Sequence, residues 1–81
     1  MPFEELRKKI DRIDDRILDL IERRISIAEK IGKAKRKKGR PIVDSSRERE
    51  ILNKLTGKTK LNKDFVRKTF EGIIEYCREN E

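Results

Sequence analysis

Two cationic residues, Arg24 and Lys35, carry the strongest chemical signal in the sequence. Arg24 stands between Leu20 and Ile27, where the apolar stripe of a predicted helix calls for a hydrophobic side chain. A guanidinium buried there alone would cost several kcal/mol, so an anionic group must meet it. Lys35 follows eleven residues later and projects from nearly the same helical face, about 16 Å away. Both side chains are long enough to converge on a small anion between them.

A second cluster of charged residues lies in the segment DSSRERE, residues 44–50. Asp44 and Ser45 are overlapping candidates for the N-cap of a short helix, and Ser45 with Glu48 fits the S-x-x-E capping box. Capping does not explain Arg47, because a cation in the first helical turn opposes the helix dipole. The free backbone N–H groups of that turn favour an anion. The segment is therefore a second candidate for anion binding.

These signals also have purely structural explanations. Arg24 could pair with a carboxylate on a neighbouring helix, and Lys35 could belong to the solvated basic run of residues 33–40.

The GKT of residues 57–59 is not a phosphate-binding P-loop, because Leu52 stands where that loop needs a glycine. With no histidine and a single cysteine, the sequence predicts no metal site and no pair of nucleophile and base.

A long helix must position the first two cations. Apolar residues at steps of three and four predict one amphipathic helix from about residue 4 to residue 38. Gly39 and Pro41 should end it, as a glycine past the last turn followed by a proline commonly does. The apolar positions of this stripe are Leu6, Ile10, Ile13, Ile17, Leu20, Ile27, Ile31 and Ala34.

Two shorter helices are predicted after it. The first should begin at Asp44 or Ser45, run to about Leu55 and end in a break at TGKTK, residues 56–60. Leu61 and Asn62 then lead into a medium helix with one apolar row, which Glu81 continues; the row is Val66, Phe70, Ile73 and Cys77. No strand-like alternation and no long linker are present. The sequence therefore predicts an all-α fold of three helices, long, short and medium, in a single domain over residues 1–81.

Composition indicates that the chain does not fold alone. Of its 81 residues, 33% are hydrophobic and 48% are charged, too few apolar side chains for a large core in one short chain. We therefore expect a homo-oligomer. The net charge of +7 attracts anions of any kind. The start MPFEELRKK has no apolar signal segment, and no run approaches the ~18 apolar residues of a membrane helix, so we expect a soluble, cytoplasmic protein without a membrane partner.

Taken in order, ELRKKIDRIDDRILDLIERRISIAEKIGKAK, RPIVDSSRERE and FEGIIEYC resemble the all-helical class of chorismate mutases, often called the AroQ class. The resemblance covers nearly the whole chain. It implies an enzyme of aromatic amino-acid biosynthesis that converts chorismate to prephenate by an intramolecular Claisen rearrangement, without a cofactor. The residues agree with this chemistry, because holding a dianion and stabilising a developing negative charge require fixed cations and hydrogen-bond donors rather than a nucleophile.

The resemblance gives the four cations separate roles. Arg7, Arg24 and Arg47 would bind the two substrate carboxylates, and Lys35 would donate to the ether oxygen. Arg7 and Arg24 are seventeen residues apart, about 25 Å along one helix, too far for both to hold one small molecule. Arg7 should therefore come from a second, antiparallel chain. This agrees with the intertwined homodimer with two shared sites that the family implies.

Four further residues take roles from the resemblance. Glu48 would accept a hydrogen bond from the ring hydroxyl, and Asp44 would contribute through the local backbone. Cys77 stands where the family often has a small polar residue. Glu81 stands where many members place a glutamine that donates to the ether oxygen, and a glutamate can do so only when protonated.

Two other functions remain open at this stage. An isochorismate pyruvate lyase shares the fold and the carboxylate-binding arginines. A basic helical dimer could bind nucleic acid through KAKRKKGR, although Glu22 and Glu29 interrupt the basic surface and no aromatic platform for bases is visible. We therefore expect chorismate, and not nucleic acid, as the partner, while a helical dimer with no catalytic role is the simplest alternative.

Overall fold

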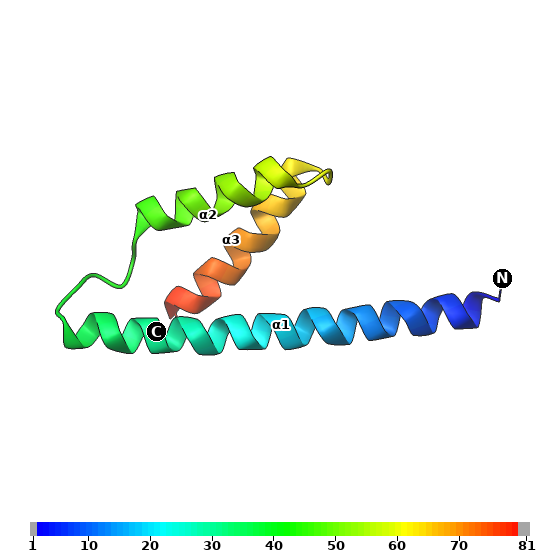
Figure 1. Ribbon diagram of the computed structural model, residues 1–81, viewed down its shortest axis with the longest axis horizontal. Coiled ribbons are helices and arrows are strands. Elements are labelled where there is room, and N and C mark those ends of the chain that lie inside the picture. Colours follow the sequence, from blue (N-terminus) through cyan, green and yellow to red (C-terminus); the bar gives the residue numbers. More distant parts are fainter. Residues whose placement is uncertain (1, 80–81) are drawn as a thin grey trace.

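The computed structural model describes residues 2–79, and the chain forms three α-helices within them (Figure 1). Helix α1 spans Phe3–Lys37, α2 spans Ser45–Lys58 and α3 spans Lys63–Glu79. No strand occurs in these described residues, and none of their helices is long and apolar enough to cross a membrane. The prediction of an all-α chain with a long, a short and a medium helix is confirmed.

The end of α1 has the geometry expected for a glycine stop. Gly39 adopts a positive φ of 67°, which a side chain would disfavour. Its N–H donates to the carbonyl of Arg36 at 3.2 Å, and the N–H of Arg40 donates to the carbonyl of Lys35 at 2.9 Å. These two bonds form a Schellman motif, which satisfies the last carbonyls of the helix. The motif places Lys35 in the final turn of α1, next to the linker that leads to α2.

Asp44 is the N-cap of α2. Its Oδ1 accepts a hydrogen bond from the backbone N–H of Arg47 at 3.0 Å. The alternative capping box of Ser45 with Glu48 is wrong, because Ser45 is already the first helical residue. The Glu48 carboxylate is thereby left available for a partner outside its own helix.

Helix α2 is longer than the sequence indicated. It continues to Lys58, so the predicted end at about Leu55 and the first three residues of the predicted break at 56–60 are wrong. Thr56 is buried within α2, and its hydroxyl donates to the carbonyl of Leu52 at 2.9 Å, so its polar group is satisfied inside the helix. The break occurs at residues 59–62 instead.

Helix α3 connects the other two helices. Asn62 begins it by accepting the N–H of Phe65 at 3.0 Å, and α3 then packs against both α2 and α1. In Figure 1 its C-terminal end reaches the C-terminal half of α1, whereas α2 lies on the far side of α3 from α1. The buried apolar side chains of the described residues are Leu52, Val66, Ile74 and Cys77.

The apolar stripe of α1 has little cover within one chain. The N-terminal half of α1 extends beyond the other two helices (Figure 1), and the chain measures 56 × 24 × 16 Å. Its radius of gyration is 16.0 Å, compared with about 12 Å for a compact domain of this length. The stripe residues with exposed fractions between 39% and 58% are Leu6, Ile10, Ile13, Ile17, Leu20, Ile27 and Ile31.

Candidate active site

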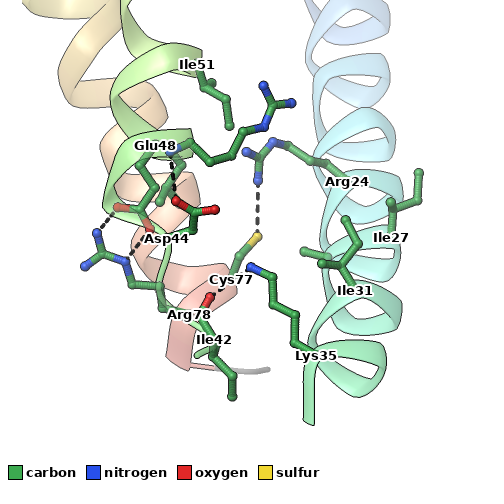
Figure 2. A pocket seen from close by; sticks show the side chains of 13 residues that line it. Arg24, Ile27, Ile31, Lys35, Ile42, Asp44, Glu48, Ile51, Cys77 and Arg78 are labelled. Atoms are coloured by element: carbon green, nitrogen blue, oxygen red, sulfur yellow. Dashed lines mark hydrogen bonds and ion pairs between the residues drawn. The ribbon is translucent and has the colours of Figure 1, made fainter. Parts of the chain in front are cut away.

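A cavity of about 260 Å³ lies between the C-terminal half of α1, the start of α2 and the end of α3 (Figure 2). Charged side chains from all three helices reach it across a largely aliphatic wall. The predicted site residues that line it are Arg24, Lys35, Asp44, Arg47, Glu48 and Cys77. The aliphatic wall consists of Ile27, Ala28, Ile31, Ile42, Ile51 and Ile74.

Arg24 points from α1 across the cavity toward α3 (Figure 2). Its Nη1 donates to the sulfur of buried Cys77 at 3.3 Å. Within residues 2–79 no carboxylate forms an ion pair with Arg24, so the structural alternative of a pairing with a neighbouring helix is not found there. A thiol is a weak acceptor and leaves most of the guanidinium donors free for an anion in the cavity.

Lys35 is held at the cavity rim by a hydrogen bond and is not a freely solvated residue of the basic run. Its Nζ donates to the backbone carbonyl of Ile42 at 3.1 Å. An ammonium has three donors, so two remain for a ligand. Arg24 and Lys35 line the same cavity, which is the convergence that their spacing in the sequence predicted.

Arg47 lines the cavity, and its guanidinium is paired with a carboxylate of its own helix. Its Nη1 lies 2.7 Å from Oε1 of Glu50, in a pair whose side chains are both exposed. Exposed pairs of this kind contribute about 0–1 kcal/mol. A carboxylate entering the cavity can therefore displace Glu50 from Arg47 at small cost.

Glu48 is held by Arg78, the residue that follows Cys77 on α3. The Nε of Arg78 donates to Oε2 of Glu48 at 2.8 Å, and a terminal guanidinium nitrogen donates to Oε1. This hydrogen bonding lowers the pKa of Glu48 from its ordinary value, although burial and the neighbouring Asp44 act in the opposite direction. Glu48 therefore presents an ionised, acceptor-only carboxylate to the cavity.

Two predicted residues are not brought to this cavity. Arg7 lies on the free half of α1, 72% exposed, with its Nη1 3.4 Å from Oε1 of Glu4. Its distance along the helix from Arg24 is about 25 Å. Glu81 lies outside the described residues. The cavity of one chain therefore holds three of the four predicted cations.

The arrangement fits a small dianion with an apolar ring. Arg24 and Lys35 come from α1 and Arg47 from α2, with aliphatic side chains and the fixed acceptor Glu48 in the same cavity wall. Such a site can bind two carboxylates, stabilise negative charge on an oxygen and accept from a hydroxyl.

Comparison with known proteins decides the family. Residues 6–81 match the family described as chorismate mutase type II. The chain belongs to the type II chorismate mutases. The family predicted from the Arg24, Lys35 and DSSRERE motifs is therefore confirmed.

Three relatives show how the similarity is distributed. The chorismate mutase of Methanocaldococcus jannaschii is 39% identical over 75 residues, covering 89% of this chain and 76% of that protein. The bifunctional chorismate mutase/prephenate dehydratase of Aquifex aeolicus is 42% identical over 95% of this chain. A chorismate mutase structure from Thermus thermophilus superposes with a TM-score of 0.91 at 30% identity, covering 95% of this chain and 90% of that one. The chain spans about a fifth, 21%, of the length of the Aquifex protein.

In this type II chorismate mutase chain, the sequence reasoning missed Arg78 as a site residue. A signal for it was present, because Arg78 follows the buried Ile74 by four residues and so continues an apolar row of α3. A cation that continues an apolar row is the same pattern that identified Arg24. Proximity to the helix end made Arg78 resemble an ordinary solvated residue.

Proposed function

We propose that the chain converts chorismate to prephenate by an intramolecular Claisen rearrangement. The observation that carries the proposal is the convergence of Arg24, Lys35 and Glu48 on one cavity with aliphatic walls. The rearrangement breaks a carbon–oxygen bond and forms a carbon–carbon bond within one molecule, so it needs no nucleophile, cofactor or external proton. We further propose that residues 1–81 act as a single domain and that the reaction takes place in the cytoplasm.

In the proposed mechanism, fixed charges select the compact substrate conformer and stabilise the transition state. Arg24 and Arg47 hold the substrate carboxylates, and Arg47 exchanges its exposed contact with Glu50 for one of them. Lys35 donates to the ether oxygen as the carbon–oxygen bond lengthens and negative charge develops there. Glu48 accepts from the ring hydroxyl, and Asp44 orients the first turn of α2. Cys77 supports Arg24 through its sulfur.

The proposed active form is an intertwined homodimer. The exposed apolar stripe of α1 needs a partner along most of its length, and a second copy of the same helix offers a complementary surface. An antiparallel pairing would bring the partner's Arg7 to the cavity that Arg24 lines. It would replace the solvent-exposed contact of Arg7 with Glu4 by a substrate carboxylate.

The experiment that tests the function is the loss of chorismate ultraviolet absorbance with purified protein, followed by identification of prephenate. Isochorismate is assayed in parallel for release of pyruvate, and duplex DNA is tested at several salt concentrations. Prephenate formation supports the proposal. Pyruvate from isochorismate without prephenate would favour the lyase, and salt-sensitive binding to DNA without turnover would favour the nucleic-acid alternative.

Glu81 gives the proposed reaction a characteristic pH dependence. A carboxyl group can donate to the ether oxygen only while it is protonated, so activity should decline as pH rises toward the alkaline range. Glu81→Gln keeps a permanent donor at this position and should flatten that decline. The measurement is kcat against pH for both proteins. An identical alkaline decline in the variant would show that Glu81 has no such role.

A further inference from the structure

Glu48 and Arg78 form an ion pair in the wall of the cavity that Arg24, Lys35 and Arg47 also line. It joins the first turn of α2 to the last part of α3, and it uses two hydrogen bonds to one carboxylate (Figure 2). The Glu48 side chain is 17% exposed and that of Arg78 is 40% exposed. Both residues also line a second hollow of about 250 Å³ between α2 and α3. The pair therefore lies where the active-site cavity meets that hollow.

The contact leaves Glu48 able to serve a substrate. An ionised carboxylate has about four acceptor positions, and Arg78 fills one on each oxygen. A position therefore remains on each oxygen for a hydroxyl in the cavity. A bidentate guanidinium also fixes the plane of the carboxylate, which a single hydrogen bond would leave free to rotate.

The other charges around Glu48 show why Arg78 matters. Asp44, at the start of α2, raises the pKa of Glu48, as does burial, while Lys35 of α1 lowers it slightly. On α3, Glu75 faces Arg78 and favours its charged form. Without Arg78, the strongest influence that keeps Glu48 ionised would be lost. Only the weaker influence of Lys35 would then counteract the rise in the pKa of Glu48 that burial and Asp44 cause.

We propose that Arg78 is a positioning residue that holds Glu48 ionised and oriented toward the substrate's ring hydroxyl. The proposal rests on the proposed chorismate mutase function. Arg78 acts through Glu48 and needs no contact with the substrate. Arg78 and Glu48 line both hollows, whereas Arg24 and Lys35 line only the active-site cavity, so the bidentate contact holds the carboxylate at the boundary between the two.

The test compares Arg78→Leu with Arg67→Leu, a matched loss of charge on the same helix at a residue that lines neither hollow. In Arg78→Leu we expect kcat/KM to fall about tenfold, the effect of one charged hydrogen bond. The acid limb of its pH profile should move to higher pH, because Glu48 protonates more easily. Arg78→Lys should restore the position of the acid limb but only part of the rate, since an ammonium cannot reproduce the bidentate geometry.

Two measurements separate this role from a structural one. In a Glu48→Gln background, adding Arg78→Leu should change kcat/KM less than twofold, because the residue through which it acts is gone. Carbon-13 NMR of labelled glutamate, assigned with Glu48→Gln, should show the Glu48 titration midpoint rising in Arg78→Leu. The proposal would be overturned if the Glu48 titration midpoint did not move in Arg78→Leu and the kinetic constants of this variant matched those of Arg67→Leu. If the wild type turned over no chorismate, the proposed function would fail, while the titration would still decide whether Arg78 holds Glu48 ionised.

Discussion

Replacing Lys35 with alanine is expected to reduce kcat for chorismate by about 10²–10³-fold, the usual cost of removing one preorganised donor to a developing negative charge. Lys35 is fixed at the cavity rim by its hydrogen bond to the carbonyl of Ile42, and two of its donors remain for the ether oxygen. Because that oxygen gains charge only as its bond breaks, KM should rise much less than kcat falls. Steady-state kinetics over a range of chorismate concentrations would measure both.

The matched control is Lys33→Ala, which removes an exposed lysine from the same basic run without touching the cavity. It should leave both kinetic constants close to those of the wild type. Circular dichroism and urea unfolding of Lys35→Ala should show a native helical content, with a loss of about 1 kcal/mol from the hydrogen bond to Ile42. A Lys35→Ala enzyme within threefold of wild-type kcat would refute the role given to Lys35.

Local signals in the sequence were sufficient to predict the end of α1. Gly39 and Pro41 predicted the stop, and the structure forms it with a positive φ at Gly39. The spacing of Arg24 and Lys35 on one face likewise predicted their convergence, because both lie on one continuous helix whose geometry is regular. Predictions of this kind succeed because every contact they require is set by residues close together in the chain.

The predictions that failed depended on side chains choosing among several partners. Ser45 and Glu48 fit a capping box, yet Asp44 caps the helix and Glu48 binds Arg78, thirty residues away. A pattern within one helix cannot show which distant cation competes for a carboxylate. The predicted break at residues 56–60 failed in the same way. The Thr56 hydroxyl donates to a carbonyl within the helix, whereas the sequence pattern suggested that Thr56 begins a turn.

The apolar stripe of α1 is a prediction that a single chain satisfies only in part. The period of the stripe predicts a buried face, whereas most of that face is exposed in one chain. Burying it in a dimer would contribute about 25 cal/mol for each Å² of apolar surface removed from water. The same geometry explains why Arg7 is absent from the cavity of its own chain. The proposed antiparallel partner would account for both observations.

That partner is tested most directly by mixing two inactive variants. Arg7→Ala and Arg24→Ala should each lower kcat/KM by about 10²-fold or more, because each removes one partner of a charged carboxylate contact. If the site takes Arg24 from one chain and Arg7 from the other, a mixed dimer contains one site with both arginines intact. Equal mixing by co-refolding makes half of the dimers mixed, so activity should recover to about one quarter of the wild-type value.

A second mixture supplies the control. Arg24 and Lys35 line the same cavity of one chain, so mixing Arg24→Ala with Lys35→Ala leaves one defect in every site of a mixed dimer and should restore nothing. Native mass spectrometry would establish that mixed dimers had formed in both samples. Recovery of activity in the first mixture alone requires a site shared between chains. If each site were built from a single chain, every site would keep its defect in a mixed dimer. Equal recovery in both mixtures, or none in either despite mixed dimers, would contradict the contribution of Arg7 from the partner chain.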